Sequence, residues 1–116
     1  MFRLLCAAAV LAPGLALAQP VQQAISATYL CDGGKVLQLA FVNLGDMSAA
    51  VVNWGGELVA LRNVPGASGV FYADFDEQRG FRWRGKGDEG FFAHLEPDDS
   101  ATEEVLLDGC KAVAAR

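Results

Sequence analysis

Short runs of alternating apolar and polar residues, separated by turn residues, fill most of the chain and constrain its fold. In Lys35–Asn43, for example, Leu37, Leu39 and Phe41 share one face of an extended strand. Such alternation is typical of strands with one buried face. Gly55–Gly56 joins two such runs and indicates a two-residue β-hairpin. The expected strands are Ala27–Cys31, Lys35–Asn43, Ala49–Trp54, Glu57–Val64, Val70–Phe75, Phe81–Lys86, Gly90–Glu96 and Glu103–Asp108.

The expected fold is all-β: a small antiparallel eight-stranded β-barrel. Consecutive hairpins in so short a chain bury their apolar side chains best if the sheet curls and closes, which also removes exposed edges. A two-sheet sandwich is the alternative, because alternation alone does not distinguish the two. Gln19–Ser26 and Ala112–Arg116 are expected to be loose ends.

Residues 1–18 have the layout of a secretory signal peptide. Arg3 provides the positive start, Leu4–Leu15 is almost wholly apolar, and Ala16–Ala18 is a small-x-small cleavage site. We expect residues 1–18 to be removed on export and residues 19–116 to form one soluble domain in the periplasm. Cys6 lies inside the signal and does not fit a lipidation site, so no membrane anchor is expected.

Removal of the signal leaves two cysteines, Cys31 and Cys110. Thiols in an oxidising compartment tend to pair. We predict one disulfide that ties the start of the domain to its end and closes the barrel.

The composition argues against several classes of function. A net charge of -5 disfavours nucleic acid or an anionic membrane surface as the main partner and favours a cationic partner, or simply solubility. A single histidine provides no histidine cluster for a metal. The chain has no Gly-x-Ser-x-Gly elbow and no phosphate-binding glycine loop. We therefore expect no catalytic residue, no metal site and no cofactor.

Polar residues at bends are the best candidates for a binding site. Ser68-Gly69 precedes one expected strand, and Lys86-Gly87 ends another. In that second strand Arg82, Arg84 and Lys86 share a face, which predicts either a basic stripe or an ordinary solvated surface.

In these motifs the domain resembles the MliC/PliC family of periplasmic inhibitors of c-type lysozyme. The resemblance runs from Tyr29-x-Cys31-Asp32-Gly33-Gly34 to Cys110, and its most specific part is Ser68-Gly69-x-x-Tyr72 followed by Lys86-Gly87. It implies an eight-stranded antiparallel barrel. It also implies that a serine and a lysine, here Ser68 and Lys86, enter the lysozyme cleft and meet its two catalytic carboxylates, with Gly69, Tyr72 and Gly87 beside them.

One departure from the family pattern affects the lysine. The family spaces these residues as Trp-x-Lys-Gly, whereas Trp83-Arg84-Gly85-Lys86-Gly87 has one residue more. In a flat strand this turns Lys86 to the opposite face. Either a bulge at Gly85 restores its direction, or Arg84 is the inserted cation.

The alternative function is a cell-envelope binding module, either an adaptor or a barrel that holds a small apolar ligand. For the latter, the expected pocket lining is Phe71, Phe75, Phe91 and Phe92. The sequence leaves open which lysozyme is the target and whether the protein forms a homodimer.

Overall fold

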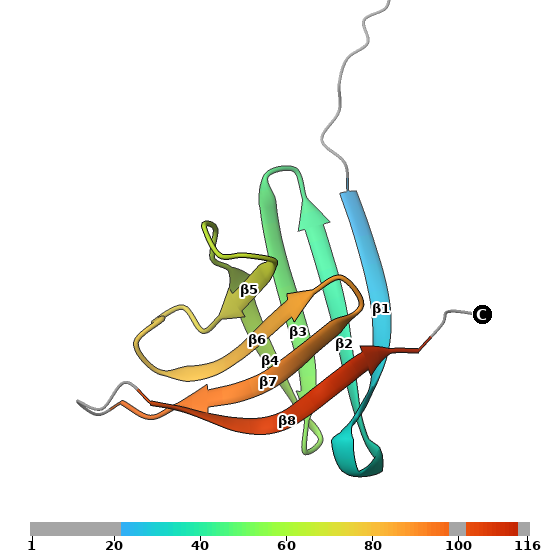
Figure 1. The fold of residues 1–116 in the computed structure, drawn as a ribbon. Coiled ribbons are helices and arrows are strands. Elements are labelled where there is room, and N and C mark those ends of the chain that lie inside the picture. Colours follow the sequence, from blue (N-terminus) through green and yellow to red (C-terminus); the bar gives the residue numbers. More distant parts are fainter. Residues whose placement is uncertain (1–21, 98–101, 114–116) are drawn as a thin grey trace, which may run out of the picture.

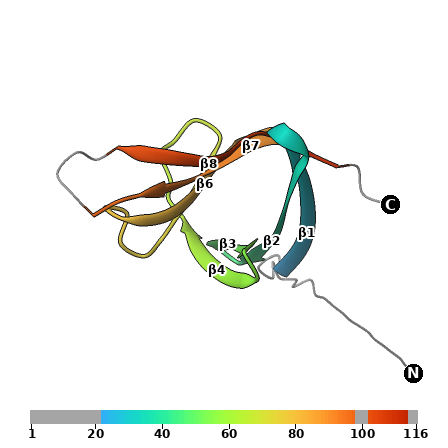
Figure 2. The same cartoon turned by 90° about the horizontal axis from the view of Figure 1, so that it is seen from below.

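The fold is a closed antiparallel barrel whose eight strands follow one another in chain order (Figures 1 and 2). The computed structural model describes residues 22–97 and 102–113, so the expected signal peptide and the Asp98–Ser100 turn lie outside the described residues. The strands are β1 Gln22–Cys31, β2 Lys35–Leu44, β3 Met47–Trp54, β4 Glu57–Asn63, β5 Val70–Ala73, β6 Gly80–Lys86, β7 Glu89–Leu95 and β8 Glu103–Ala112; a short 3₁₀ turn, η1 Asp32–Gly34, joins β1 to β2. The predicted barrel is confirmed, and the sandwich is wrong. In the described part of the chain no helix has the length and apolarity needed to cross a bilayer.

The Gly55–Gly56 hairpin forms as predicted. Trp54 pairs directly with Glu57 across a two-residue turn. Both glycines have positive φ angles, 60° and 85°, which a side chain disfavours and which match the twist of the flanking strands.

The inward-facing residues of all eight strands fill the barrel. The largest fully buried side chains include Trp83, Phe92 and Leu37. The aromatic rings of the core pack closely. The ring centroids of Tyr29 and Trp83 lie 4.7 Å apart, and those of Phe81 and Phe92 lie 5.3 Å apart. Aromatic residues therefore supply much of the core.

The predicted disulfide joins Cys31, at the end of β1, to Cys110 in β8, with an S–S distance of 2.11 Å. Both residues are buried. The bond lies where β1 and β8 close the barrel, a seam that in the described residues has two paired positions, Tyr29 with Ala112 and Leu30 with Lys111, and a hydrogen bond from the Val113 N–H to the Thr28 carbonyl. The disulfide thus reinforces the short hydrogen-bonded pairing between β1 and β8.

Strands β1 and β8 extend furthest beyond their predicted bounds, by five and four residues. The expectation of a loose segment before Ala27 is wrong for its described part, because β1 pairs with β2 back to Gln22 opposite Leu44. The Gln, Ala and Ser residues of this stretch hide the alternation. β8 continues past Gly109 to Ala112, because Ala112 donates its backbone N–H to the Asp88 carbonyl at 2.7 Å.

Candidate functional site

The two candidate loops emerge at the same end of the barrel. Val70 at the start of β5 pairs with Gly85 near the end of β6. The chain therefore enters β5 from Ser68-Gly69 at the level where it leaves β6 through Lys86-Gly87. All four loop residues are exposed. The structure thus brings together the serine and the lysine that lie 18 positions apart in the sequence.

Gly69 fixes the distance between the two loops. Its φ angle is +79°, and a Cβ placed on it would clash with the carbonyl oxygen of Gly85 and lie 3.2 Å from the Cβ of Lys86. The serine loop therefore rests directly on the backbone of the lysine hairpin. Any larger residue at position 69 would have to push the two loops apart.

The bulge at Gly85, one of the two alternatives for this strand, does not form. β6 keeps an unbroken register with both neighbours: Gly85 pairs with Val70 on one side and with Gly90 on the other, and Lys86 pairs with Glu89. The register shifts of this sheet lie between β7 and β8. Lys86 consequently follows the alternation of the strand onto its outward face, opposite to Trp83, which is the direction expected of a strand without a bulge. It is exposed because it is the last residue before the turn.

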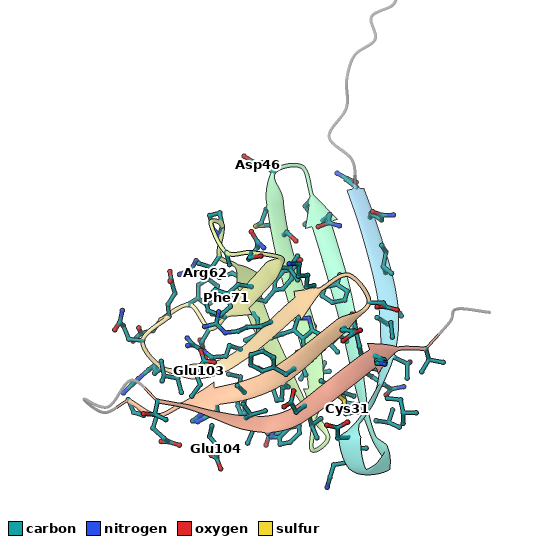
Figure 3. All side chains as sticks on the ribbon, in the orientation of Figure 1. Cys31, Asp46, Arg62, Phe71, Glu103 and Glu104 are labelled. Atoms are coloured by element: carbon teal, nitrogen blue, oxygen red, sulfur yellow. A yellow bond between two sulfur atoms is a disulfide. The ribbon has the colours of Figure 1, made fainter. Side chains whose placement is uncertain are left out.

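The basic stripe, one of the two alternatives for this face, does not form, because Glu103 pairs with two of its three members. Arg82 is only 4% exposed, and its Nη1 lies 2.8 Å from Oε2 of Glu103. Nη2 of Arg84 lies 2.6 Å from the same oxygen, and the Arg84 guanidinium lies 4.0 Å from the ring centroid of Phe71. The positions of Phe71 and Glu103, which contact the two arginines, are labelled in Figure 3.

Of the three basic residues on this face of β6, Lys86 is the one left available for a partner. Arg84 is held by Glu103 and Phe71, which makes it a poor substitute. Among the residues that the structure describes, no carboxylate lies within ion-pair distance of Lys86. The sequence did not reveal the role of Glu103, because it lies 19 residues from Arg84 in the chain.

The Arg82–Glu103–Arg84 network predicts an acid-sensitive barrel. Burial raises the pKa of Glu103, but hydrogen bonds from Arg84 and Arg82 outweigh it and hold that pKa below its ordinary value of 4.5. A lowered pKa in the folded state means that the network stabilises fully above the ordinary value, and that this stability is lost as the pH falls through the folded value. We expect the melting temperature to fall more steeply below pH 4.5 in the wild type than in Glu103→Gln.

At neutral pH, Glu103→Gln is expected to lower the free energy of unfolding by about 3 kcal/mol, because it leaves the buried Arg82 charge without a counter-charge. The matched control is Glu104→Gln, since Glu104 is the exposed neighbour on the same strand. Urea unfolding measures both. Equal stability of the two variants would contradict the role given to Glu103.

Tyr72 does not lie on the binding surface that the motif suggested. It is buried, and its hydroxyl lies 2.9 Å from the Ser48 Oγ, within hydrogen-bond distance. It pairs with Trp83 beneath the two loops. Tyr72 can therefore support β5 from inside, whereas Ser68 and Lys86 face outward.

The phenylalanines expected to line a ligand pocket do not converge. Phe92 is fully buried in the core and Phe75 is 80% exposed, whereas Phe71 and Phe91 pair with Arg84 from its two neighbouring strands. Phe75 borders a groove of about 530 Å³ on the outer side of β3 and β4. Within the described residues no group of acidic, histidine or cysteine side chains could hold a metal ion.

Comparison with known proteins identifies the family. Residues 29–100 match the family model for MliC, described as membrane-bound lysozyme-inhibitor of c-type lysozyme. A membrane-bound lysozyme inhibitor of C-type lysozyme from Cupriavidus necator is 34% identical over 84 residues. That match spans 72% of this chain but only 62% of the relative.

Two solved structures resemble the barrel. PliC-St, a periplasmic lysozyme inhibitor of C-type lysozyme from Salmonella typhimurium, superposes with a TM-score of 0.65 at 22% identity, covering 79% of this chain and 100% of the other. This likeness shows the fold alone. Pseudomonas aeruginosa MliC, solved in complex with hen egg white lysozyme, superposes with a TM-score of 0.55 at 27% identity, covering 88% of this chain and 96% of the other. The matched family is one of inhibitor proteins and not of enzymes, and this chain belongs to the MliC family.

Proposed function

We propose that the protein inhibits c-type lysozyme by inserting the Ser68 loop and the Lys86 hairpin into the active-site cleft. The observation that carries this proposal is the packing of Gly69 on Gly85 and Lys86, which holds the two exposed loops side by side at one end of a rigid barrel. A preorganised pair of groups loses little conformational freedom on binding.

The chemistry of the two groups fits the proposed target. Lysozyme uses one protonated and one ionised carboxyl group. The Lys86 ammonium offers a positive charge and three N–H donors to the ionised carboxylate. The Ser68 hydroxyl can accept a hydrogen bond from the protonated acid and donate one to a neighbouring oxygen.

The acidic character of the chain supports a basic partner. The net charge is -5, and Asp88 and Glu89 are exposed on the same hairpin as Lys86. Complementary charges of this kind accelerate association and favour partners of opposite sign. Asp88 and Glu89 would lie at the rim of the contact while Lys86 enters the cleft.

We also propose that residues 1–18 are cleaved on export and that residues 19–116 act as a soluble periplasmic domain. The layout of the N-terminus and the disulfide support this proposal, since disulfides persist in oxidising compartments.

An inhibition assay tests the proposed function. The purified protein should slow cell-wall lysis by a c-type lysozyme at near-equimolar ratio. Ser68→Ala should weaken inhibition by about 1–3 kcal/mol, because a buried carboxyl group loses a hydrogen-bond partner. Ser26→Ala, an exposed serine on β1, is the matched control and should inhibit like the wild type. Undiminished lysis at large molar excess of the protein would reject the function, and full inhibition by Ser68→Ala would reject the site.

A further inference from the structure

One side of the barrel presents a sheet surface without charge. The outward positions of β1, β2 and β3, which alternate with the buried core residues, carry no Asp, Glu, Lys or Arg. Leu58 and Ala60 of β4 extend the same surface, which Arg62 borders on the β4 side and Lys111 of β8, the partner of Leu30, borders on the β1 side. We call the outward residues of β1–β3 together with Leu58 and Ala60 the neutral face.

The neutral face is also apolar. Its two ends carry large exposed side chains: Leu30, Val36 and Leu58 at one end, and Leu44 and Met47 at the other. Leu58 is 77% exposed. Between these ends lies a hollow of about 290 Å³, which the apolar Ala40, Val51 and Leu58 border together with four polar residues, Ser26, Thr28, Gln38 and Asn53. Large exposed apolar surfaces of this kind mark interaction sites.

The charge of the chain restricts what can cover this face. An anionic membrane would repel a protein of net charge -5, and the neutral face carries no lysine or arginine of its own to offset the repulsion; only Lys111 and Arg62 lie at its two borders. The same net charge drives two copies apart wherever acidic residues meet. On the neutral face two copies meet without like charges, and the protruding Leu58 of one copy has the apolar shape that the hollow of the other accepts.

The size of the face sets the strength of such a contact. Four strands are about 19 Å wide, and β1 from Gln22 to Leu30 is about 27 Å long. Each copy can therefore bury at most about 500 Å², or about 1,000 Å² in total, which lies at the lower limit of specific interfaces. A reversible dimer follows, and not an obligate one.

We propose that the neutral face is a self-association surface on which two copies of this chain pair in a two-fold, reversible dimer. Figure 2 shows β1–β4 along one side of the barrel and β6–β8 along the other. The lysine hairpin between β6 and β7 thus stays accessible in each copy. This inference does not depend on lysozyme inhibition.

Sedimentation equilibrium of the purified protein, from low-micromolar to sub-millimolar concentration, tests the proposal. The apparent mass should rise with concentration toward twice that of the monomer. Ala40→Glu, at the centre of the face, and Leu58→Glu, at its rim, should each weaken association at least about 100-fold, because like charges then face each other. Leu58→Glu is not expected to disturb the fold, since Leu58 lies on the surface.

Val105→Glu is the matched control, because Val105 is 48% exposed on β8, away from the neutral face. Thermal melting should show that all three variants are folded. A monomer at every concentration would overturn the proposal. So would a dimer that survives both Ala40→Glu and Leu58→Glu, or one that Val105→Glu weakens equally. Inhibition of lysozyme by the two monomeric variants should equal that of the wild type, which separates this surface from the proposed inhibitory one.

Discussion

Replacing Lys86 by glutamate is expected to abolish lysozyme inhibition at concentrations where the wild type inhibits fully. In the proposed complex, the substitution would remove the cation that faces an ionised carboxylate and would place a like charge against it. Loss of one partner of a desolvated charge pair costs about 2–5 kcal/mol, and like-charge repulsion adds to this. We therefore expect affinity to fall by about 1,000-fold or more. Isothermal titration against c-type lysozyme measures the change.

The matched control is Lys35→Glu, which makes the same charge change at an exposed residue of β2. It alters the net charge equally, so any loss due to weaker long-range attraction appears in both variants. Lys35→Glu should retain nearly full affinity. If Arg84→Ala abolished binding and Lys86→Glu did not, Arg84 would be the inserted cation and the assignment of Lys86 would be wrong.

Removal of the disulfide should have the largest effect on stability. The Cys31–Cys110 bond closes a loop with a sequence separation of 79. In the chain-entropy account this loop length corresponds to a stabilisation of about 4.5 kcal/mol. The total stability of a domain of this size is only about 5–15 kcal/mol. We expect the melting temperature of Cys31→Ser/Cys110→Ser to fall by about 20 °C.

Thermal unfolding with and without reductant checks this value. The reduced wild type should melt like the double variant, and reductant should not change the variant itself. Loss of the disulfide should also loosen the candidate site, because β8 holds the lysine hairpin through the hydrogen bond from the Ala112 N–H to the Asp88 carbonyl. A double variant that melts within a few degrees of the oxidised wild type would show that the short β1–β8 ladder suffices to close the barrel.

The barrel could be predicted from the sequence because its signals are local. Alternation in Lys35–Asn43 and the Gly55–Gly56 turn each depend on residues close together in the chain. The start of β1 could not be predicted in this way, since Gln22–Ser26 joins the sheet only through pairing with β2. Tertiary pairing here overrides a weak local pattern.

In the candidate site, too, features that depend on neighbouring residues could be predicted, and features that depend on strand pairing could not. Exposure of Ser68 and Lys86 at bends follows from the neighbouring glycines, and the structure agrees. The pairing of Arg82 and Arg84 with Glu103 does not follow from the sequence, because β6 and β8 come together only in the folded sheet. The direction of the Lys86 side chain could not be predicted either, because it depends on how β6 pairs with β5 and β7. That pairing is unbroken and excludes a bulge at Gly85.

Competition for the lysozyme cleft tests the central proposal most directly. A soluble cell-wall oligosaccharide that occupies the catalytic cleft would be added at increasing concentration while binding of this protein to c-type lysozyme is measured. If Ser68 and Lys86 fill the cleft, the apparent dissociation constant should rise linearly with the oligosaccharide concentration. A dissociation constant that stays unchanged while the oligosaccharide saturates the cleft would show that the protein binds elsewhere on lysozyme.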